Sequence, residues 1–320
     1  MRAVVVTAKG GPDVLQLREL PDPEPGPGEL LVRIGAAGVN YRDVYERIGL
    51  GAYDAAPGTI AGVEGAGEVV AVGDAGLAVG DRVAWWSAQG SYAELVLVAA
   101  DRAVPVPDGV STEIAAAVLL QGMTAYYLAA DCYPIQPGDS VLVHAAAGGV
   151  GLLLTQIAKL RGARVIATTS GGEKEGLARG AGADEVIGYD GFAARVRELT
   201  GGEGVAAVYD GIGRTTFDES LTALRPTGSM ILYGSASGAV PPVETGLLAA
   251  RGSVYLQRPV LGTYTRTRDL LLALAGEVFA LVREGKLDVR IGARYALEDA
   301  AKSHEDLEAR RTTGKLLLIP

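Results

Sequence analysis

The chain has 320 residues, of which 48% are hydrophobic and 21% are charged, and its formal net charge is −9 at pH 7. This length allows two domains with a sizeable core, and the composition is that of a globular protein. The acidic balance argues against binding to a nucleic-acid backbone, which needs a basic field. A single cysteine, Cys132, excludes an intrachain disulfide and favours a reducing, cytoplasmic location. The aliphatic runs, such as residues 115–120, are too short to cross a bilayer, so no membrane association is expected.

The first 120 residues consist of short apolar segments separated by turns rich in Gly and Pro. We expect strands at residues 4–6, 29–34, 68–72, 81–85 and 92–98. Residues 21–28, PDPEPGPG, form a loop, because proline and glycine at this density exclude a helix. The pattern indicates a largely antiparallel, barrel-like domain.

From about residue 120 to 256, strands alternate with helix-length segments. Strands are expected at 141–144, 164–168, 185–188, 206–209, 229–233 and 253–256, with a helix over 150–160. This alternation predicts a doubly wound parallel sheet, and therefore an α/β fold class. A helix over 269–284 and an amphipathic stretch over 297–310 precede a last strand, 315–319, which we expect to return to the first domain. The predicted domains are 1–120 together with 257–320, and 121–256.

A turn of small residues follows the first of these parallel strands. Ala146, Gly148 and Gly151 match the (Gly/Ala)-x-Gly-x-x-Gly spacing of a dinucleotide-binding turn. Small residues are needed here because a pyrophosphate must approach the backbone closely, and the N–H groups at the helix start meet its negative charge. A glycine turn without a ligand is the alternative, but a strand before the turn and a helix after it favour the nucleotide.

The end of the next parallel strand indicates which nucleotide binds. In NAD-specific folds an Asp or Glu at this position accepts hydrogen bonds from the ribose 2′-OH. Here the strand ends in Thr-Thr-Ser170 without a carboxylate, and Lys174 follows shortly after it. Hydroxyls and a cation suit a 2′-phosphate, so we expect NADPH rather than NADH. The alternative for Lys174 is a surface ion pair with Glu173.

Metal ligands are scarce in the sequence. It contains two histidines, His144 and His304, and the single Cys132, whereas zinc in proteins usually takes three or four ligands of these types. We therefore expect no metal site. His144, at the end of an apolar strand, is expected to be a packed core residue rather than a base. Cys132 has no recognisable basic partner and is not expected to be a nucleophile, and no Gly-x-Ser-x-Gly motif supports a hydrolase.

Four segments are typical of one family: AAGVNYRD at 36–43, AGVEGAG at 61–67, QGMTAYYL at 121–128 and AAAGGVG at 145–151. Together with the order of the domains they resemble a zinc-free medium-chain dehydrogenase/reductase, and more narrowly the NADPH:quinone oxidoreductases related to zeta-crystallin. The similarity extends essentially from end to end. Zinc-dependent relatives carry Cys near position 40 and His before the glutamate of the second segment, where this chain has Asn40 and Val63. The resemblance implies a GroES-like catalytic domain joined to a Rossmann-like domain.

The resemblance also assigns roles to individual residues. Asn40 and Thr124 would lie beside the nicotinamide ribose and ring. The residues facing the pyrophosphate would be Ala147, Gly148, Gly149 and Val150. Lys174, Tyr189 and Arg310 would lie near the 2′-phosphate, where the strand end already places Ser170. Ser235 and Gly238 would flank the nicotinamide half. Tyr45 and Tyr53 would line the substrate site, where a flat aromatic acceptor could stack, although tyrosines in a strand-rich domain are also common packing residues.

The activity implied by the resemblance is hydride transfer from C4 of NADPH to a bound quinone, which is already electrophilic and needs no Lewis-acid metal. Two alternatives stay open. One is NADPH-dependent reduction of α,β-unsaturated aldehydes or ketones on the same fold. The other is a nucleotide-bound, non-catalytic role as a crystallin-like or RNA-binding protein; the net charge counts against RNA, and the complete cofactor turn counts against a purely structural role.

A homodimer is expected through the edge of the parallel sheet, at strand 253–256. An unpaired strand edge exposes backbone N–H and C=O groups and is normally covered or paired, and a two-fold axis is the commonest oligomer symmetry. The family resemblance indicates the same assembly. The alternative is an edge covered by the chain's own C-terminal helices.

Overall fold

The computed structural model describes residues 1–74 and 76–320. The chain divides into two compact units: unit 1 comprises residues 1–120, 265–285 and 289–320, and unit 2 comprises 121–264 and 286–288. Residues 257–264 and 286–288 therefore cluster with unit 2, whereas the sequence-based division places them in the first domain. The α/β fold class is confirmed.

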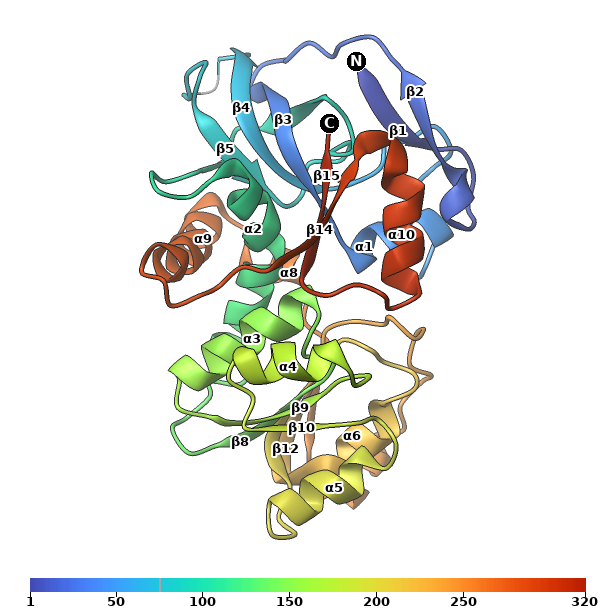
Figure 1. Ribbon diagram of the computed structural model, residues 1–320, viewed down its shortest axis with the longest axis vertical. Coiled ribbons are helices and arrows are strands. Elements are labelled where there is room, and N and C mark those ends of the chain that lie inside the picture. The colour runs from blue at the N-terminus through green and yellow to red at the C-terminus, as the bar shows by residue number, and fades with distance from the viewer. Residues whose placement is uncertain (75) are drawn as a thin grey trace. The chain divides into compact units, whose positions relative to one another are not determined.

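Unit 1 is built on a mainly antiparallel sheet (Figure 1). In spatial order its strands are β14 (Ile291–Ala296), β15 (Lys315–Ile319), β3 (Glu29–Val39), β4 (Glu64–Val72), β5 (Arg82–Trp85) and β7 (Val104–Pro105), and β6 (Leu95–Ala99) also pairs with β3. A separate antiparallel pair consists of β1 (Arg2–Val6) and β2 (Leu15–Glu19). β15 pairs antiparallel with β3, so the last strand returns to the first domain as predicted.

Several strands of unit 1 differ from their predicted extents. β3 continues five residues past position 34, and β4 begins four residues before position 68. Both extensions are rich in Gly and Ala, so the alternation of apolar and polar residues that predicts a strand is missing there. A Cβ at Gly67 would lie 2.0 Å from the backbone oxygen of Arg33, which shows why this stretch needs glycine. β2, β7 and β14 were not predicted.

The helices of unit 1 are α1 (Tyr41–Ile48), α9 (Arg268–Arg283) and α10 (Ala300–Glu308), with 3-10 turns at η1 (Pro12–Val14) and η3 (Leu297–Asp299). α9 begins where Thr267 caps it by accepting a hydrogen bond from the Leu270 N–H at 3.3 Å. The predicted amphipathic stretch over 297–310 thus consists of η3 and α10. Arg310 lies past the helix end, with a φ of 57°.

α2 (Thr112–Tyr127) begins in unit 1 and continues into unit 2, where a π-helical turn, η2 (Leu128–Cys132), extends it. The continuous helix of 21 residues contains an 18-residue window with a mean hydropathy of 1.2, and by length and composition it could cross a membrane. However, 72% of its apolar window is buried inside the fold, as in the core helix of a globular protein.

Unit 2 contains a parallel sheet. Its strands, in spatial order, are β10 (Glu185–Ile187), β9 (Arg164–Thr168), β8 (Ser140–Val143), β11 (Val205–Asp210), β12 (Leu224–Leu232) and β13 (Tyr255–Gln257). Its helices are α3 (Gly149–Leu160), α4 (Glu173–Gly180), α5 (Phe192–Leu199), α6 (Phe217–Ala223), α7 (Thr245–Ala250) and α8 (Leu261–Tyr264). Figure 1 shows α3 and α4 on one side of this sheet and α5 and α6 on the other. This is the predicted doubly wound arrangement, whose strand order reverses between β8 and β11.

The edge strand β13 begins two residues later than predicted. Gly252 and Ser253 have φ values of 98° and 56°, so they form a left-handed turn after α7 instead of extended backbone. The Val254 N–H donates to the Leu248 carbonyl at 3.1 Å and closes that turn. β13 does lie at the sheet edge, and the side chain of Tyr255 is 65% exposed.

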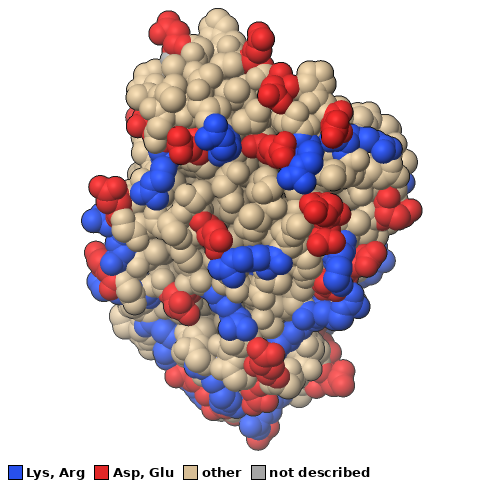
Figure 2. All heavy atoms as spheres, turned by 45° about the horizontal axis from the view of Figure 1, so that its top comes forward, with Lys and Arg blue, Asp and Glu red and all other residues tan. Residues whose placement is uncertain are grey.

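Charged side chains of both signs are interspersed over the face drawn in Figure 2. Neither Lys and Arg nor Asp and Glu form a broad patch on that face. The net charge of −9 is therefore spread out rather than gathered there.

Candidate functional site

The carboxyl end of β8 lies where the strand order of unit 2 reverses. Open α/β sheets bind their ligands at this point. α3 starts there, with Gly148 as its N-cap in extended conformation (φ −79°, ψ 171°). The first N–H groups of an α-helix have no intrahelical partner and present partial positive charge, so this turn offers donors to an anion.

The glycines of this turn are held by close contacts. A Cβ at Gly151 would lie 2.3 Å from the backbone oxygen of Ala145, so glycine is required for the helix to pack against the turn. At Gly149 a Cβ would overlap the side-chain amide of Gln121. Gly148 is more open, with the Ala145 oxygen at 3.2 Å, and leaves its backbone approachable. The turn, with Ala147 and Val150 beside these glycines, fits a dinucleotide pyrophosphate.

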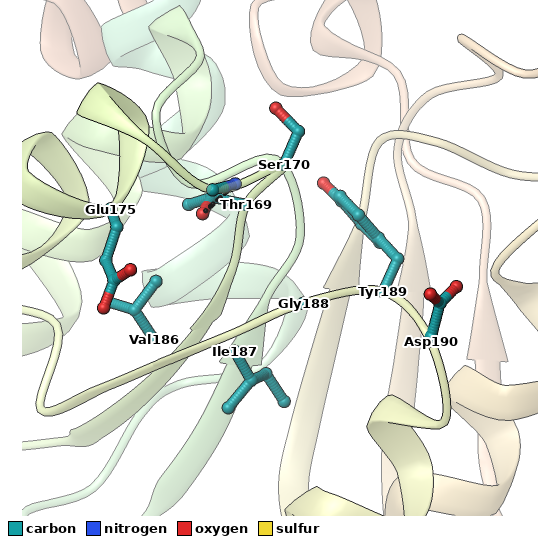
Figure 3. Close-up of a pocket in the computed structure, with 9 residues that line it drawn as sticks. Thr169, Ser170, Glu175, Val186, Ile187, Gly188, Tyr189 and Asp190 are labelled. Atoms are coloured by element: carbon teal, nitrogen blue, oxygen red, sulfur yellow. Dashed lines mark hydrogen bonds between the residues drawn. The ribbon is translucent and has the colours of Figure 1, made fainter.

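A cavity of about 380 Å³ lies next to the ends of β9 and β10 (Figure 3). Its lining residues are Thr169, Ser170, Gly171, Glu175, Val186, Ile187, Gly188, Tyr189 and Asp190. Ser170 and Tyr189 are both predicted site residues, and Figure 3 shows the phenol of Tyr189 extending toward Ser170. Lys174 lies on α4, half-buried, and does not line the cavity. The carboxylate of Glu175 is paired with Arg179 at 3.0 Å, which offsets its repulsion of a phosphate.

Tyr189 joins the cavity to the glycine turn. Its hydroxyl accepts a hydrogen bond from the Ala145 N–H at 3.1 Å, and its ring stacks on His144 with 6.2 Å between centroids. Ala145 has a φ of 49°, a left-handed conformation that is uncommon without glycine. The predicted pyrophosphate turn and the predicted 2′-phosphate region are therefore linked by one side chain.

A buried set of residues in unit 2, which we call the hydroxyl network, comprises His144, Thr168, Asp210, Thr216 and Ser220. His144 Nδ1 lies 2.8 Å from the Thr168 hydroxyl, and its Nε2 lies 2.9 Å from the Ser220 hydroxyl. The hydroxyls of Ser220 and Thr216 donate to Asp210 Oδ2 at 3.1 and 2.7 Å. Burial lowers the pKa of His144, so its ring is neutral. The prediction that His144 is a packed core residue is confirmed.

Asp210 holds the loop that follows β11. Its Oδ1 accepts hydrogen bonds from the N–H groups of Ile212 and Gly213 at 2.7 and 3.0 Å. The predicted residues Ser235 and Gly238 form a turn after β12, closed by a 2.9 Å bond from the Gly238 N–H to the Ser235 carbonyl. The Arg214 N–H donates to the Gly238 carbonyl at 3.3 Å, so these two loops lie together.

In unit 1 the side chain of Asn40 precedes α1 and is 5% exposed. Its Oδ1 accepts a hydrogen bond from Lys315 Nζ at 2.8 Å, and its Nδ2 donates to Glu64 Oε2 at 2.8 Å and to the Gly38 carbonyl at 3.2 Å. Lys315 and Glu64 form an ion pair of 2.5 Å, with side chains 1% and 0% exposed. The second oxygen of Glu64 accepts from the Leu120 N–H at 2.7 Å.

A chain of hydrogen bonds leads from the other side of Asn40 toward the surface. Asp43 Oδ2 accepts from the Asn40 N–H and from the Tyr92 hydroxyl, both at 2.8 Å. The Tyr92 hydroxyl lies 3.1 Å from His304 Nε2, and His304 Nδ1 lies 3.2 Å from Arg47 Nη1. Arg47 pairs with the part-exposed Glu308 at 2.7 Å. We call Asn40, Asp43, Arg47, Glu64, Tyr92, His304 and Lys315 the charged network.

The direction of this chain is set by Arg47. A guanidinium only donates, so His304 accepts at Nδ1, carries its proton on Nε2 and donates to Tyr92. Burial, together with the charge of Arg47, lowers the pKa of His304 to about 3, which keeps the ring neutral. Burial, reinforced by the charge of Glu46, raises the pKa of Asp43 to about 7 against the hydrogen bonds from Asn40 and Tyr92.

The remaining predicted residues are placed as follows. Tyr45 and Tyr53 lie together with ring centroids 5.7 Å apart; Tyr45 is 8% exposed and packed, whereas Tyr53 is half-buried. Thr124 is buried on α2. Arg310 is exposed in the turn after α10.

Cys132 and the metal-ligand types remain to be placed. Burial raises the pKa of Cys132 to about 11, and its Sγ lies 3.1 Å from the Tyr264 hydroxyl, so it is a poor nucleophile. Within residues 1–74 and 76–320, no three His, Cys, Asp or Glu side chains are grouped to hold a metal ion.

Sequence reasoning missed the charged residues of these networks, which are Asp43, Arg47, Glu64, Asp210 and Lys315. For Glu64 a signal was present, because a lone carboxylate among the small residues of 61–67 needs a partner when it is buried. The partner lies 251 residues away, and nothing local indicates it.

Two family models match the chain: the alcohol dehydrogenase GroES-like domain over residues 26–108 and a zinc-binding dehydrogenase domain over 149–275. The quinone oxidoreductase of Pseudomonas aeruginosa is 45% identical over 326 residues, which span 100% of this chain and 99% of that protein. A mycobacterial structure in complex with NADPH is 49% identical, with a TM-score of 0.97 over 100% of both chains. The Escherichia coli quinone oxidoreductase complexed with NADPH is 39% identical, also with a TM-score of 0.97 over 100% of both chains.

Proposed function

The chain belongs to the quinone oxidoreductase family of the medium-chain dehydrogenases/reductases, and on that premise we propose that it transfers reducing equivalents from NADPH to a quinone. The observation that carries the proposal is the glycine turn at the switch point of unit 2, joined by Tyr189 to a cavity at the ends of β9 and β10. NADPH would supply a hydride at C4 of its nicotinamide, and the protein supplies position and a water-poor site.

In unit 2 the backbone from Ala147 to Val150 would bind the pyrophosphate. Ser170, Lys174 and Tyr189 would bind the 2′-phosphate, because β9 ends without the carboxylate that would select a ribose 2′-OH. Ser235 and Gly238 would flank the nicotinamide half. The bonds from Ile212 and Gly213 to Asp210 would keep the neighbouring loop in place.

In unit 1, Asn40 would hold the nicotinamide ribose, and Tyr45 and Tyr53 would contact a flat quinone ring. Arg310, also of unit 1, would add charge toward the 2′-phosphate. Thr124, on the part of α2 that belongs to unit 2, would lie beside the nicotinamide. Each assignment rests on the family resemblance and on the position of the residue in its element.

We propose that the reaction needs no zinc. Asn40 and Val63 stand where zinc-dependent relatives carry Cys and His, and both histidines of the chain are fully buried in hydrogen-bond networks. Activity should survive exhaustive chelation, and metal analysis of the purified protein should find no stoichiometric zinc. A tightly held equivalent of zinc that tracks activity would overturn this part of the proposal.

The test of the function is steady-state oxidation of NADPH and of NADH with a panel of quinones and of α,β-unsaturated ketones. We expect turnover with quinones and preference for NADPH. Turnover of the unsaturated ketones alone would assign the second reductase activity. Binding of NADPH without turnover of either class would contradict an enzymatic role.

We further propose a homodimer through the β13 edge, supported by the exposed side chain of Tyr255. Tyr255→Lys would place like charges near each other across the two-fold axis, and sedimentation at micromolar concentration should then show the monomer. A dimer that this variant leaves intact would place the interface elsewhere.

A cytoplasmic location, which the single cysteine favours, stays a prediction.

A further inference from the structure

Lys315 and Glu64 form a fully buried ion pair whose members come from distant strands. Lys315 is the first residue of β15, and Glu64 is the first residue of β4. Long charged side chains are almost never fully buried unless they are paired, and a buried pair is weak evidence for stability alone. Stability alone therefore does not explain why an ion pair is buried at this position.

Both charged groups contact the same neutral side chain, the amide of Asn40. Lys315 Nζ carries only donors and faces Asn40 Oδ1 at 2.8 Å. Glu64 Oε2 accepts, and faces Asn40 Nδ2 at 2.8 Å. A half-turn of the amide would bring its NH₂ group against the ammonium and its oxygen against the carboxylate, so only one orientation is compatible with the pair.

Gly38 provides the space in which the three groups meet. It is opposite Glu64 in the β3–β4 ladder and opposite Leu317 in the β3–β15 ladder. A Cβ at Gly38 would lie 2.5 Å from Glu64 Oε2 and 2.7 Å from Lys315 Nζ. The register of three strands thus brings the two charges together over a position that has no side chain.

We propose that the Lys315–Glu64 pair is a positioning device that fixes the amide orientation of Asn40 for binding the nicotinamide ribose of NADPH. Because the side chain of Lys315 is 1% exposed, it would act through Asn40 rather than by contact with cofactor or substrate. The inference rests on the proposed function, since it assumes that Asn40 contacts the ribose.

The test is the double variant Lys315→Met/Glu64→Gln, which removes both charges and keeps side chains of similar size. Neutral replacement of a whole buried pair is compatible with folding, whereas removal of one partner leaves an uncompensated charge. Calorimetric titration should show NADPH affinity falling by about threefold to tenfold, the loss expected for one hydrogen bond. Adenosine 2′,5′-bisphosphate, which lacks the nicotinamide ribose, should bind with unchanged affinity.

A double-mutant cycle with Asn40→Ala separates positioning from general damage. In the Asn40→Ala background, Lys315→Met/Glu64→Gln should cause no further loss of NADPH affinity, because the amide on which the pair acts is gone. The control is Arg294→Met/Glu113→Gln, which neutralises an exposed ion pair of unit 1 and should leave binding unchanged.

Three results would overturn the inference: unchanged NADPH affinity in the double variant, equal losses for both ligands, or full additivity with Asn40→Ala. Failure of the proposed function has a different signature, since the unaltered protein would then either fail to bind NADPH or bind it without reducing a quinone. Gly38→Ala gives an independent measurement, because its Cβ would separate the charges without removing them. It should weaken NADPH binding and leave binding of the bisphosphate unchanged.

Discussion

Each unit buries a histidine and at least one carboxylate, and the two units satisfy these groups by different means. In the hydroxyl network of unit 2, Asp210 is surrounded by N–H and O–H donors, three of which lie within six residues of it. In the charged network of unit 1, the charges of Glu64 and Lys315 compensate each other across two strands. Loss of one member should therefore cost a hydrogen bond in unit 2 but leave an isolated charge in unit 1.

The largest expected effect in this comparison is the loss of unfolding free energy in Lys315→Met. The variant leaves Glu64 buried without its counter-charge, and removal of one partner of such a pair costs about 3–5 kcal/mol of unfolding free energy. Denaturant titration followed by circular dichroism measures the loss. Lys315→Met/Glu64→Gln should recover most of it, and equal losses in the single and double variants would mean that packing, not charge, is responsible.

Lys174→Ala concerns a cation of unit 2. We expect Lys174, unlike Lys315, to contribute to cofactor binding rather than to the free energy of unfolding. Loss of a charge-assisted contact with a phosphate costs about 1.5–3 kcal/mol, which corresponds to roughly a tenfold to hundredfold weaker Kd for NADPH. NADH lacks that phosphate, so its Kd should stay nearly constant. Titration of both cofactors measures the difference, and parallel losses would show that Lys174 acts on the fold.

Ser220→Ala examines the hydroxyl network itself. The change leaves His144 Nε2 without its neighbour at 2.9 Å and should cost about 1–2 kcal/mol of unfolding free energy. Ser303→Ala is a matched control, since among the described residues the hydroxyl of this buried serine bonds only to the Ala300 carbonyl of its own helix. A larger cost for Ser303→Ala than for Ser220→Ala would contradict the importance of the network.

The smallest effect concerns the pH dependence of stability. The pKa of His304 falls from 6.5 to about 3 on folding, so stability decreases as pH falls from about 6.5 toward 3. The pKa of Asp43 rises from 3.8 to about 7 on folding. Its contribution to folding stability is therefore complete below pH 3.8 and is lost as pH rises through 7. Between about pH 3.8 and 6.5 both groups titrate. The two dependences of stability on pH, each roughly 1 kcal/mol per pH unit, then oppose each other.

His304→Gln should unmask the slope of Asp43. Between about pH 4.5 and 6.5 the variant should lose stability with rising pH by up to roughly 1 kcal/mol per unit more than the unaltered protein. Denaturant titration across this range measures both slopes. Parallel curves for the two proteins would show that His304 does not resist protonation in the fold.

The sequence predicted those features whose cause is local. The glycine turn, the parallel strands and the missing carboxylate after β9 depend on neighbouring residues, and the alternation of strand and helix gave the topology. The predicted start of β13 was wrong because Ser253 takes a left-handed conformation, which a serine does not indicate in the sequence. The Lys315–Glu64 pair could not be predicted, since its partners are separated by 251 residues and meet only through the register of β15, β3 and β4.

The one-way hydrogen bonds from Arg47 through His304 and Tyr92 to Asp43 have a consequence for proton movement. A relay conducts only if every member can release the proton that it receives, and a guanidinium cannot. When Asp43 is protonated, Oδ2 already accepts two hydrogen bonds, so the proton resides on Oδ1, which has no hydrogen-bond partner among the described residues. This series of hydrogen bonds therefore does not conduct protons between Asp43 and the surface. By this route Asp43 exchanges its proton with water only when the structure around α1 opens.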